Sequence, residues 1–224
     1  MPRLLDWSLW EPRFERFLAR RSSRADVAHD LAHVRRVVAI AKRLAASENT
    51  RLEIVLPAAW LHDCVTIPKD SPQRRAASAM AAQAAGDFLR GSAYPAELVP
   101  GVEHAIEAHS FSAQVAPETR EAMVVQDADR LDALGAIGIA RCLTLGGAMG
   151  RELYDSRELF PETRIPDEEA NVLDHFYLKL FRLADTMNTV VGQAEAWRRT
   201  AFMHEYLRQL GKEIQVGYEL EERA

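Results

Sequence analysis

The stretch AAWLHDCV at 58–65 is hydrophobic until it reaches the adjacent pair His62-Asp63. An imidazole nitrogen and a carboxylate oxygen are ordinary ligands of divalent cations, but an isolated pair of this kind carries little information. Two further histidines, His33 and His109, occur in other segments that have helical periodicity. The chemistry that these residue types could support together is a metal site assembled from separate helices.

Each of the three histidines falls on the apolar side of its segment. At 100° per residue, His33 shares a stripe with Val37, and His62 shares one with Ala58. His109 lies on an apolar stripe in the same way. Burying several imidazoles costs free energy unless every ring nitrogen finds a partner, and one cation satisfies them together. The alternative for each is a core histidine that is bonded to a backbone carbonyl.

A metal needs more negative charge than Asp63 alone supplies. The segment 124–140, VVQDADRLDALGAIGIA, interrupts an apolar helical pattern with three aspartates: Asp127, Asp129 and Asp132. By helical geometry either Asp129 or Asp127 could point inward as a ligand, and Asp132 is expected to support the ligands by hydrogen bonding. The alternative is a helix whose carboxylates only pair with neighbouring arginines.

The elements that must position these residues are helical. Ala-rich segments with helical periodicity dominate, and apolar residues that alternate with a period of two are almost absent. We therefore expect an all-α fold in a single domain over 1–224. The segment 145–170, rich in Gly, Pro and charge, is expected to be a lid over the substrate or a long surface connection. The helices predicted between the Gly and Pro clusters span about 10–20, 25–46, 51–64, 72–90, 96–109, 117–142, 167–185 and 191–212.

Composition limits the partners of the protein. The 224 residues are 48% hydrophobic, which is enough apolar material for a substantial core. A formal net charge of -5 argues against a nucleic acid polymer or an anionic membrane as partner, so a phosphate must be met by a local group of cations. The two cysteines form no disulfide or zinc-ribbon spacing, and no signal peptide or membrane-spanning run is evident. We expect a cytoplasmic protein, and the sequence leaves oligomeric assembly open.

The order of these elements resembles the HD-domain metal-dependent phosphohydrolase superfamily. The strings HDLAHVRRV, WLHDC, IPKDSP, AHSFS and QDADRLDALGAIGIA are similar to small single-domain bacterial HD hydrolases, and the resemblance covers about 25–140. It implies an HD-type helical bundle and, among the aspartates of 124–140, it selects Asp129 rather than Asp127. The metal ligands that it implies are His33, His62, Asp63 and Asp129, and Asp132 and Asp127 are expected to support these ligands from behind.

The resemblance also implies an activity. It points to a divalent-metal-dependent phosphohydrolase that acts on a nucleotide or a related small phosphate ester. One such reaction is cleavage of a nucleoside triphosphate to monophosphate and pyrophosphate by metal-bound water, with His62 and Asp63 central to catalysis. The nitrogen and oxygen ligands suit Mn²⁺, Fe²⁺ or Co²⁺, with Mg²⁺ as a further candidate. The alternative is a non-catalytic sensor of the HD-type fold that binds metal or nucleotide.

Some specific activities within the superfamily are not implied. The HDxxED motif of alarmone hydrolases is missing, because the dipeptide is followed here by CVTI. The HD-GYP extension of enzymes that cleave cyclic dinucleotides is also missing.

Several cations and histidines near the ligands are candidate substrate contacts: Lys69, Arg74, Arg36, His109 and His29. Lys69 and Arg74 follow the His-Asp pair at the expected start of a helix, where backbone amides and arginines favour anions. Arg36 is one helical turn from His33, and His109 could instead complete a second metal site. The alternative for the basic segment is a solvated turn.

Overall fold

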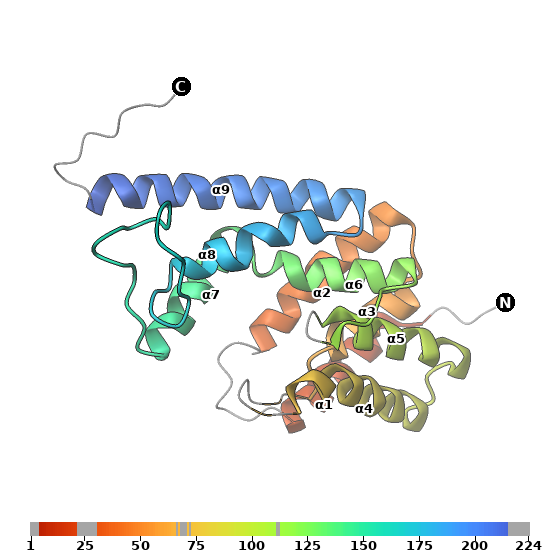
Figure 1. Ribbon diagram of the computed structural model, residues 1–224. Coiled ribbons are helices and arrows are strands. Elements are labelled where there is room, and N and C mark those ends of the chain that lie inside the picture. The colour runs from red at the N-terminus through yellow and green to blue at the C-terminus, as the bar shows by residue number, and fades with distance from the viewer. Residues whose placement is uncertain are drawn as a thin grey trace. The chain divides into compact units, whose positions relative to one another are not determined.

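The computed structural model describes residues 5–21, 31–65, 67, 71, 73–110 and 113–214, and no strand occurs in these ranges (Figure 1). The all-α prediction is therefore confirmed. No single helix in the described ranges is long and apolar enough to cross a bilayer. The α-helices are α1 (Trp7–Arg21), α2 (Leu31–Glu48), α3 (Leu52–Leu61), α4 (Ala77–Gly91), α5 (Val99–His109), α6 (Arg120–Leu131), α7 (Gly135–Ala148), α8 (Asp174–Leu178) and α9 (Val190–Ile214). Short 3-10 helices occupy Arg74–Ala76, Ala96–Leu98 and Leu180–Thr186.

Backbone contacts divide the chain into two compact units. One comprises Met1–Asp132 and Met187–Gly192, and the other comprises Ala133–Thr186 and Gln193–Ala224. In the first unit, α3 packs against α2, α5 and α6, while α4 packs on α5 and α1 packs on α3 (Figure 1). All four residues that are predicted to bind metal belong to this unit. The organisation of 1–224 as a single domain stays a prediction.

Helix α3 is the central element of the first unit. Every residue from Val55 to Leu61 is buried, so this helix has no solvent-facing side in its second half. The chain turns directly after Leu61, and His62 is only 1% exposed. Because α3 is surrounded by other helices, the His62-Asp63 pair at its C-terminal end lies in the interior of the unit. Helix α2 is amphipathic, and its buried side includes His33 and Val37, as the helical geometry predicts.

The helix predicted over 117–142 is wrong as one element, because α6 and α7 are separate. Leu134 has an extended backbone, with φ −118° and ψ 159°, and Gly135 has φ +74°. A positive φ of this size favours glycine, so the chain breaks at the string DALG. The predicted helix over 167–185 is likewise replaced by the short helix α8 and the 3-10 helix that follows it.

The segment between α7 and α8 is fastened within the second unit. Arg164 forms a two-point ion pair with the fully buried Asp174, with N···O distances of 2.5 and 2.6 Å. The backbone of Glu152 accepts a hydrogen bond from the amide of Val172 and donates one to the carbonyl of Ala170. Residues 149–173 therefore form a connection that contains no helix but is held by these bonds. Movement of this segment as a lid stays a prediction.

Asp127 ties the residues before α9 to α6. Its fully buried carboxylate accepts hydrogen bonds from the backbone amides of Asn188 (2.9 Å) and Thr189 (2.8 Å) and from the Thr189 hydroxyl (2.7 Å). Thr189 caps α9 by accepting from the Gly192 amide at 3.0 Å. A Cβ on Gly192 would lie 2.5 Å from Asp127 Oδ2, so the close approach requires glycine here.

We expect Asp127→Ala to lower the free energy of unfolding by about 3 kcal/mol, because the buried amide and hydroxyl of Thr189 and the partly buried amide of Asn188 lose their acceptor. Asp87→Ala is the control, since the Asp87 side chain is 68% exposed; it should change stability by less than about 0.5 kcal/mol. Urea denaturation of the two variants measures the difference. Equal, small effects would contradict the anchoring role of Asp127.

Candidate metal centre

The four predicted ligands converge in the first unit. His33 comes from α2, His62 and Asp63 follow α3, and Asp129 comes from α6. His33 Nε2 lies 3.4 Å from Asp129 Oδ1 and 3.7 Å from Asp63 Oδ2. His62 Nε2 lies 3.4 Å from Asp63 Oδ2 and 3.8 Å from Asp129 Oδ1. Residues separated by up to 96 positions in the sequence (129 minus 33) thus form one group of donors, which we call the His/Asp cluster.

The spacing around His62 fits a shared cation. Its buried Nε2 has no hydrogen-bond partner among the described residues. The nearest carboxylate oxygens, at 3.4 and 3.8 Å, lie beyond the usual hydrogen-bond length of about 2.7–3.2 Å. Two ligand atoms that each lie about 2.1 Å from one ion are about 3.0 Å apart at a right angle and about 4.2 Å apart when opposite. The donors of His33, His62 and Asp129 all lie within 4.8 Å of one another, so this group could hold an ion.

The histidines present the same ring nitrogen to the cluster. His33 Nδ1 donates to Asp132 Oδ2 at 2.7 Å, and His62 Nδ1 donates to the Ala59 carbonyl at 2.9 Å. Because a carbonyl or carboxylate oxygen only accepts, Nδ1 carries the proton and Nε2 is left to face the aspartates. A histidine that is held at Nδ1 in this way is the usual arrangement for a ligand that binds metal through Nε2.

His109, at the end of α5, lies at the edge of the cluster. Its Nδ1 donates to the Ile106 carbonyl at 2.5 Å, and its Nε2 is 3.6 Å from Asp63 Oδ1. The rings of His109 and His62 have centroids 4.9 Å apart at 81°. His62, Asp63 and His109 form a second group of three donors within 4.8 Å. The two predicted roles of His109, as a substrate contact and as a further metal ligand, both remain compatible with this position.

Asp132 and Arg36 support His33 from behind. Asp132 is fully buried and accepts from His33 Nδ1 and, at 2.7 Å, from Arg36 Nε. Arg36 Nη2 adds a second bond to the same carboxylate at 3.0 Å. The predicted contact of Arg36 with substrate stays a prediction. Asp132 therefore occupies the position that was predicted for a residue supporting the ligands.

The electrostatics of the cluster follow from its mixture of rings and carboxylates. Burial opposes a charge on His33, but attraction to Asp129, Asp132 and Asp63 outweighs it and raises the pKa from 6.5 to about 11. Burial alone would raise the pKa of Asp63, yet electrostatic attraction to His62 and contacts with His109 and His33 hold it well below 3.8. The carboxylates are therefore ionised at neutral pH. A cation that binds through His33 Nε2 must displace a proton.

Solvent reaches the cluster from the aspartate side. The His33 and His62 side chains are 2% and 0% exposed, whereas Asp63 and Asp129 are 19% and 29% exposed. The histidines thus form the closed side, and a ligand would approach past the two carboxylates.

Other predicted site residues lie elsewhere. The predicted support of the metal ligands by Asp127 is wrong, because its carboxylate is directed to Asn188 and Thr189 instead. His29 and Lys69 lie outside the described residues, as does the side chain of Arg74. Their predicted contacts with substrate stay predictions.

Sequence reasoning missed Gln126. Its buried side chain donates to the Ala108 carbonyl at 2.6 Å, next to His109, and accepts from Asn188 Nδ2 at 2.8 Å. This amide joins α5 to α6 at the level of the cluster. The available signal was a polar residue that follows Val124 and Val125 directly.

The raised pKa of His33 predicts a pH-dependent stability when metal is chelated. Because the folded pKa is above the unfolded value of 6.5, the stabilisation is complete below pH 6.5 and is lost as pH rises toward 11. Between pH 7 and pH 9 we expect the free energy of unfolding to fall by about 1.4 kcal/mol per pH unit for one proton. Denaturant titrations in the presence of chelator measure this free energy at each pH. In the His33→Gln variant the free energy of unfolding should fall less steeply with pH. A flat wild-type profile would contradict the charge assignment.

Comparisons with known proteins agree with this geometry. The HD domain family model matches residues 30–134, which contain the whole cluster. The chain is 35% identical over 190 residues to the uncharacterized protein YpgQ of Bacillus subtilis strain 168, covering 83% of this chain and 84% of YpgQ. The recognised resemblance is thereby confirmed at the level of the family.

Two solved structures have the same fold. The crystal structure of Bacillus subtilis YpgQ in complex with ADP superposes with a TM-score of 0.70 at 33% identity, covering 91% of this chain and 98% of that one. A crystal structure of an HD-superfamily hydrolase from Bacillus thuringiensis gives a TM-score of 0.69 at 33% identity, covering 92% and 98%. The matched region, the sequence identity over most of the chain and the shared fold together show that this chain belongs to the HD-domain family.

Proposed function

We propose that the chain is a divalent-metal-dependent phosphohydrolase that acts on a nucleotide or a related small phosphate ester. The observation that carries this proposal is the buried His62 Nε2, which faces two carboxylate oxygens at 3.4 and 3.8 Å and bonds to neither. That spacing suits donors around one cation better than it suits an ion pair. The family relationship supports hydrolysis as the reaction.

The residues that would hold the cation are His33, His62, Asp63 and Asp129. Two imidazole nitrogens and two carboxylates suit Mn²⁺, Fe²⁺ or Co²⁺. When bound, such a cation lowers the pKa of a coordinated water and withdraws charge from a phosphoryl oxygen.

The protein's own side chains orient the reactants. Asp63 is ionised and partly exposed, so it can accept a hydrogen bond from the attacking water. Its low pKa makes it a weak general base, and its part is to hold the water in line with the phosphorus. The buried histidines exclude solvent from the opposite side, so substrate enters past Asp63 and Asp129.

The nucleotide is the substrate class that the comparisons favour. The related YpgQ was crystallised in complex with ADP, and its fold matches this chain over 91% of its length. We infer that the phosphates of a nucleotide approach the His/Asp cluster here as well. Cleavage of a nucleoside triphosphate to monophosphate and pyrophosphate is the reaction to test first, and the cytoplasm is the location that we propose for it.

We expect His62→Ala to lower turnover more than about 100-fold and to remove bound metal, because residues that merely support ligands already contribute 10–100-fold. Asp129→Ala should lose metal in the same way. Asp127→Ala is the matched control two residues away, and it should keep its metal despite its lower stability. Metal analysis and pyrophosphate release from nucleoside triphosphates, with Mn²⁺ and with chelator, measure both effects.

The outcomes separate the competing functions. Release of phosphate or pyrophosphate that depends on Mn²⁺ supports the hydrolase. Metal or nucleotide binding without turnover of any nucleotide would favour the sensor instead. Metal retained by both His62→Ala and Asp129→Ala would refute the ligand assignment.

Asp132→Asn tests the support of His33. The amide keeps the shape of the side chain but removes the charge that holds Nδ1–H and Arg36. We expect metal affinity to fall about 10- to 100-fold while the fold is retained. Competition with a fluorescent chelator measures the affinity, and circular dichroism measures folding. Unchanged affinity would show that Asp132 contributes only to packing.

A further inference from the structure

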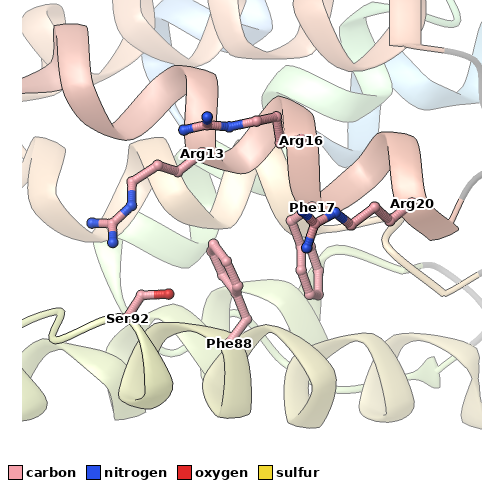
Figure 2. Close-up of a pocket in the computed structure, with 6 residues that line it drawn as sticks. All are labelled: Arg13, Arg16, Phe17, Arg20, Phe88 and Ser92. Atoms are coloured by element: carbon pink, nitrogen blue, oxygen red, sulfur yellow. The ribbon is translucent and has the colours of Figure 1, made fainter.

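A second group of cationic side chains lies away from the His/Asp cluster. Three arginines and a phenylalanine of α1, a phenylalanine of α4 and the serine that follows α4 surround a hollow of about 280 Å³ (Figure 2). Figure 2 shows the arginines projecting from α1 above Phe88 and Ser92. We call this the arginine hollow. Its lining residues are Arg13, Arg16, Phe17, Arg20, Phe88 and Ser92, and none of them belongs to the His/Asp cluster.

The helix places the three arginine positions on one stripe. At 100° and 1.5 Å per residue, Arg13, Arg16 and Arg20 fall within about 60° of one another and span about 10 Å along the axis. Their neighbours Trp10 and Phe14 are buried, so the stripe lies at the rim of the packed side of α1. The arrangement presents a row of positive charge beside an apolar surface.

No carboxylate of the described residues neutralises this row. The two glutamates of α1 are engaged by cations of α2: Glu11 by Lys42 at 2.7 Å and Glu15 by Arg35 at 3.0 Å. Arg13, Arg16 and Arg20 form no ion pair in the described ranges. In a chain of net charge -5, a row of three uncompensated arginines is a local reversal of charge.

Two of the guanidinium groups are held in position. The Arg13 guanidinium carbon lies 4.5 Å from the centroid of the Trp10 ring, a cation–π contact. Arg16 Nε donates to the Pro12 carbonyl at 3.2 Å, which leaves both of its terminal nitrogens for a ligand. Fixed guanidinium groups with free N–H donors match the oxygens of a phosphate.

The apolar side of the hollow is aromatic. The rings of Phe17 and Phe88 have centroids 4.3 Å apart at 32°, and Phe17 is only partly buried. Partly exposed aromatic rings beside arginines stack on planar bases. Ser92, one turn after Phe88, adds a hydroxyl at the same edge.

We propose that the arginine hollow binds a nucleoside di- or triphosphate, with its base against Phe17 and Phe88 and its phosphates along the arginines. An inorganic anion would use the charge but not the rings, whereas an apolar ligand would use the rings but not the charge. A nucleotide uses both. Because no lining residue belongs to the His/Asp cluster, this site would bind nucleotide in addition to the proposed hydrolytic centre, and the proposal does not require that the centre be active.

Equilibrium dialysis of the metal-loaded full chain against radiolabelled ADP tests the proposal. We expect the wild-type chain to bind two ADP molecules. The double variant Arg16→Gln/Arg20→Gln should bind one, because the affinity of the arginine hollow for ADP falls at least about tenfold. The control is Arg208→Gln/Lys212→Gln, which removes the same charge from two exposed positions of α9 and should leave both sites intact.

The outcomes distinguish this site from the proposed hydrolytic one. If the wild-type chain binds one ADP and the arginine substitutions abolish its binding, the result would support nucleotide binding in the arginine hollow. It would also show that ADP does not bind at the His/Asp cluster. A single ADP that survives these substitutions, or two that survive them, would overturn the proposal.

Phe88→Leu tests the base contact. This substitution should lower the affinity for ADP several-fold and leave the affinity for inorganic pyrophosphate unchanged. Equal effects on both would overturn the assignment to a nucleotide, as would binding of a single-stranded oligonucleotide at these arginines without ADP.

Discussion

The orientation of three buried imidazole rings is the constraint on which the site depends. Each ring donates a hydrogen bond from Nδ1–H to a fixed acceptor, which is Asp132 for His33 and a helix carbonyl for His62 and His109. The rings cannot turn without losing these bonds in a buried place, where an unpaired polar group is costly. Their Nε2 atoms are consequently held toward the carboxylates at distances of 3.4–3.8 Å. The packing of α3 inside the unit is what brings His62 to this point.

Helix α6 and its C-terminal cap, Asp132, show how one short segment serves three purposes. Asp127 faces the residues before α9, Asp129 faces the cluster, and Asp132 lies behind His33. Positions two residues apart on a helix differ by about 200°, so Asp127 and Asp129 must point to different neighbours. The three carboxylates therefore do not compete for one site. One of them stabilises the fold, one faces the cluster, and one supports a histidine.

Helical periodicity was sufficient to predict the all-α fold and the inward direction of His33, because burial on α2 repeats with the turn of the helix. Periodicity could not choose between Asp127 and Asp129, since the partners of Asp127 lie 61 and 62 residues further along the chain. Only the family resemblance made that choice. The break at Gly135 was missed because its positive φ leaves no trace in the apolar pattern.

The arginine hollow could not be predicted for a similar reason. Arg13, Arg16 and Arg20 occupy ordinary exposed positions of an amphipathic helix, where charged residues are expected. They form one site only together with Phe88 of α4, which lies about seventy residues later in the sequence and lines the same hollow. The surroundings of a side chain depend on contacts between segments that are distant in the sequence. A single sequence shows the residues of each segment but does not show which distant segments contact each other.

The most direct test of a cation at the His/Asp cluster is electron paramagnetic resonance of the full chain with one equivalent of Mn²⁺. Two imidazole ligands predict hyperfine coupling from two histidine ¹⁴N nuclei to the bound ion. A spectrum of fully hydrated Mn²⁺, with no nitrogen coupling, would contradict the account.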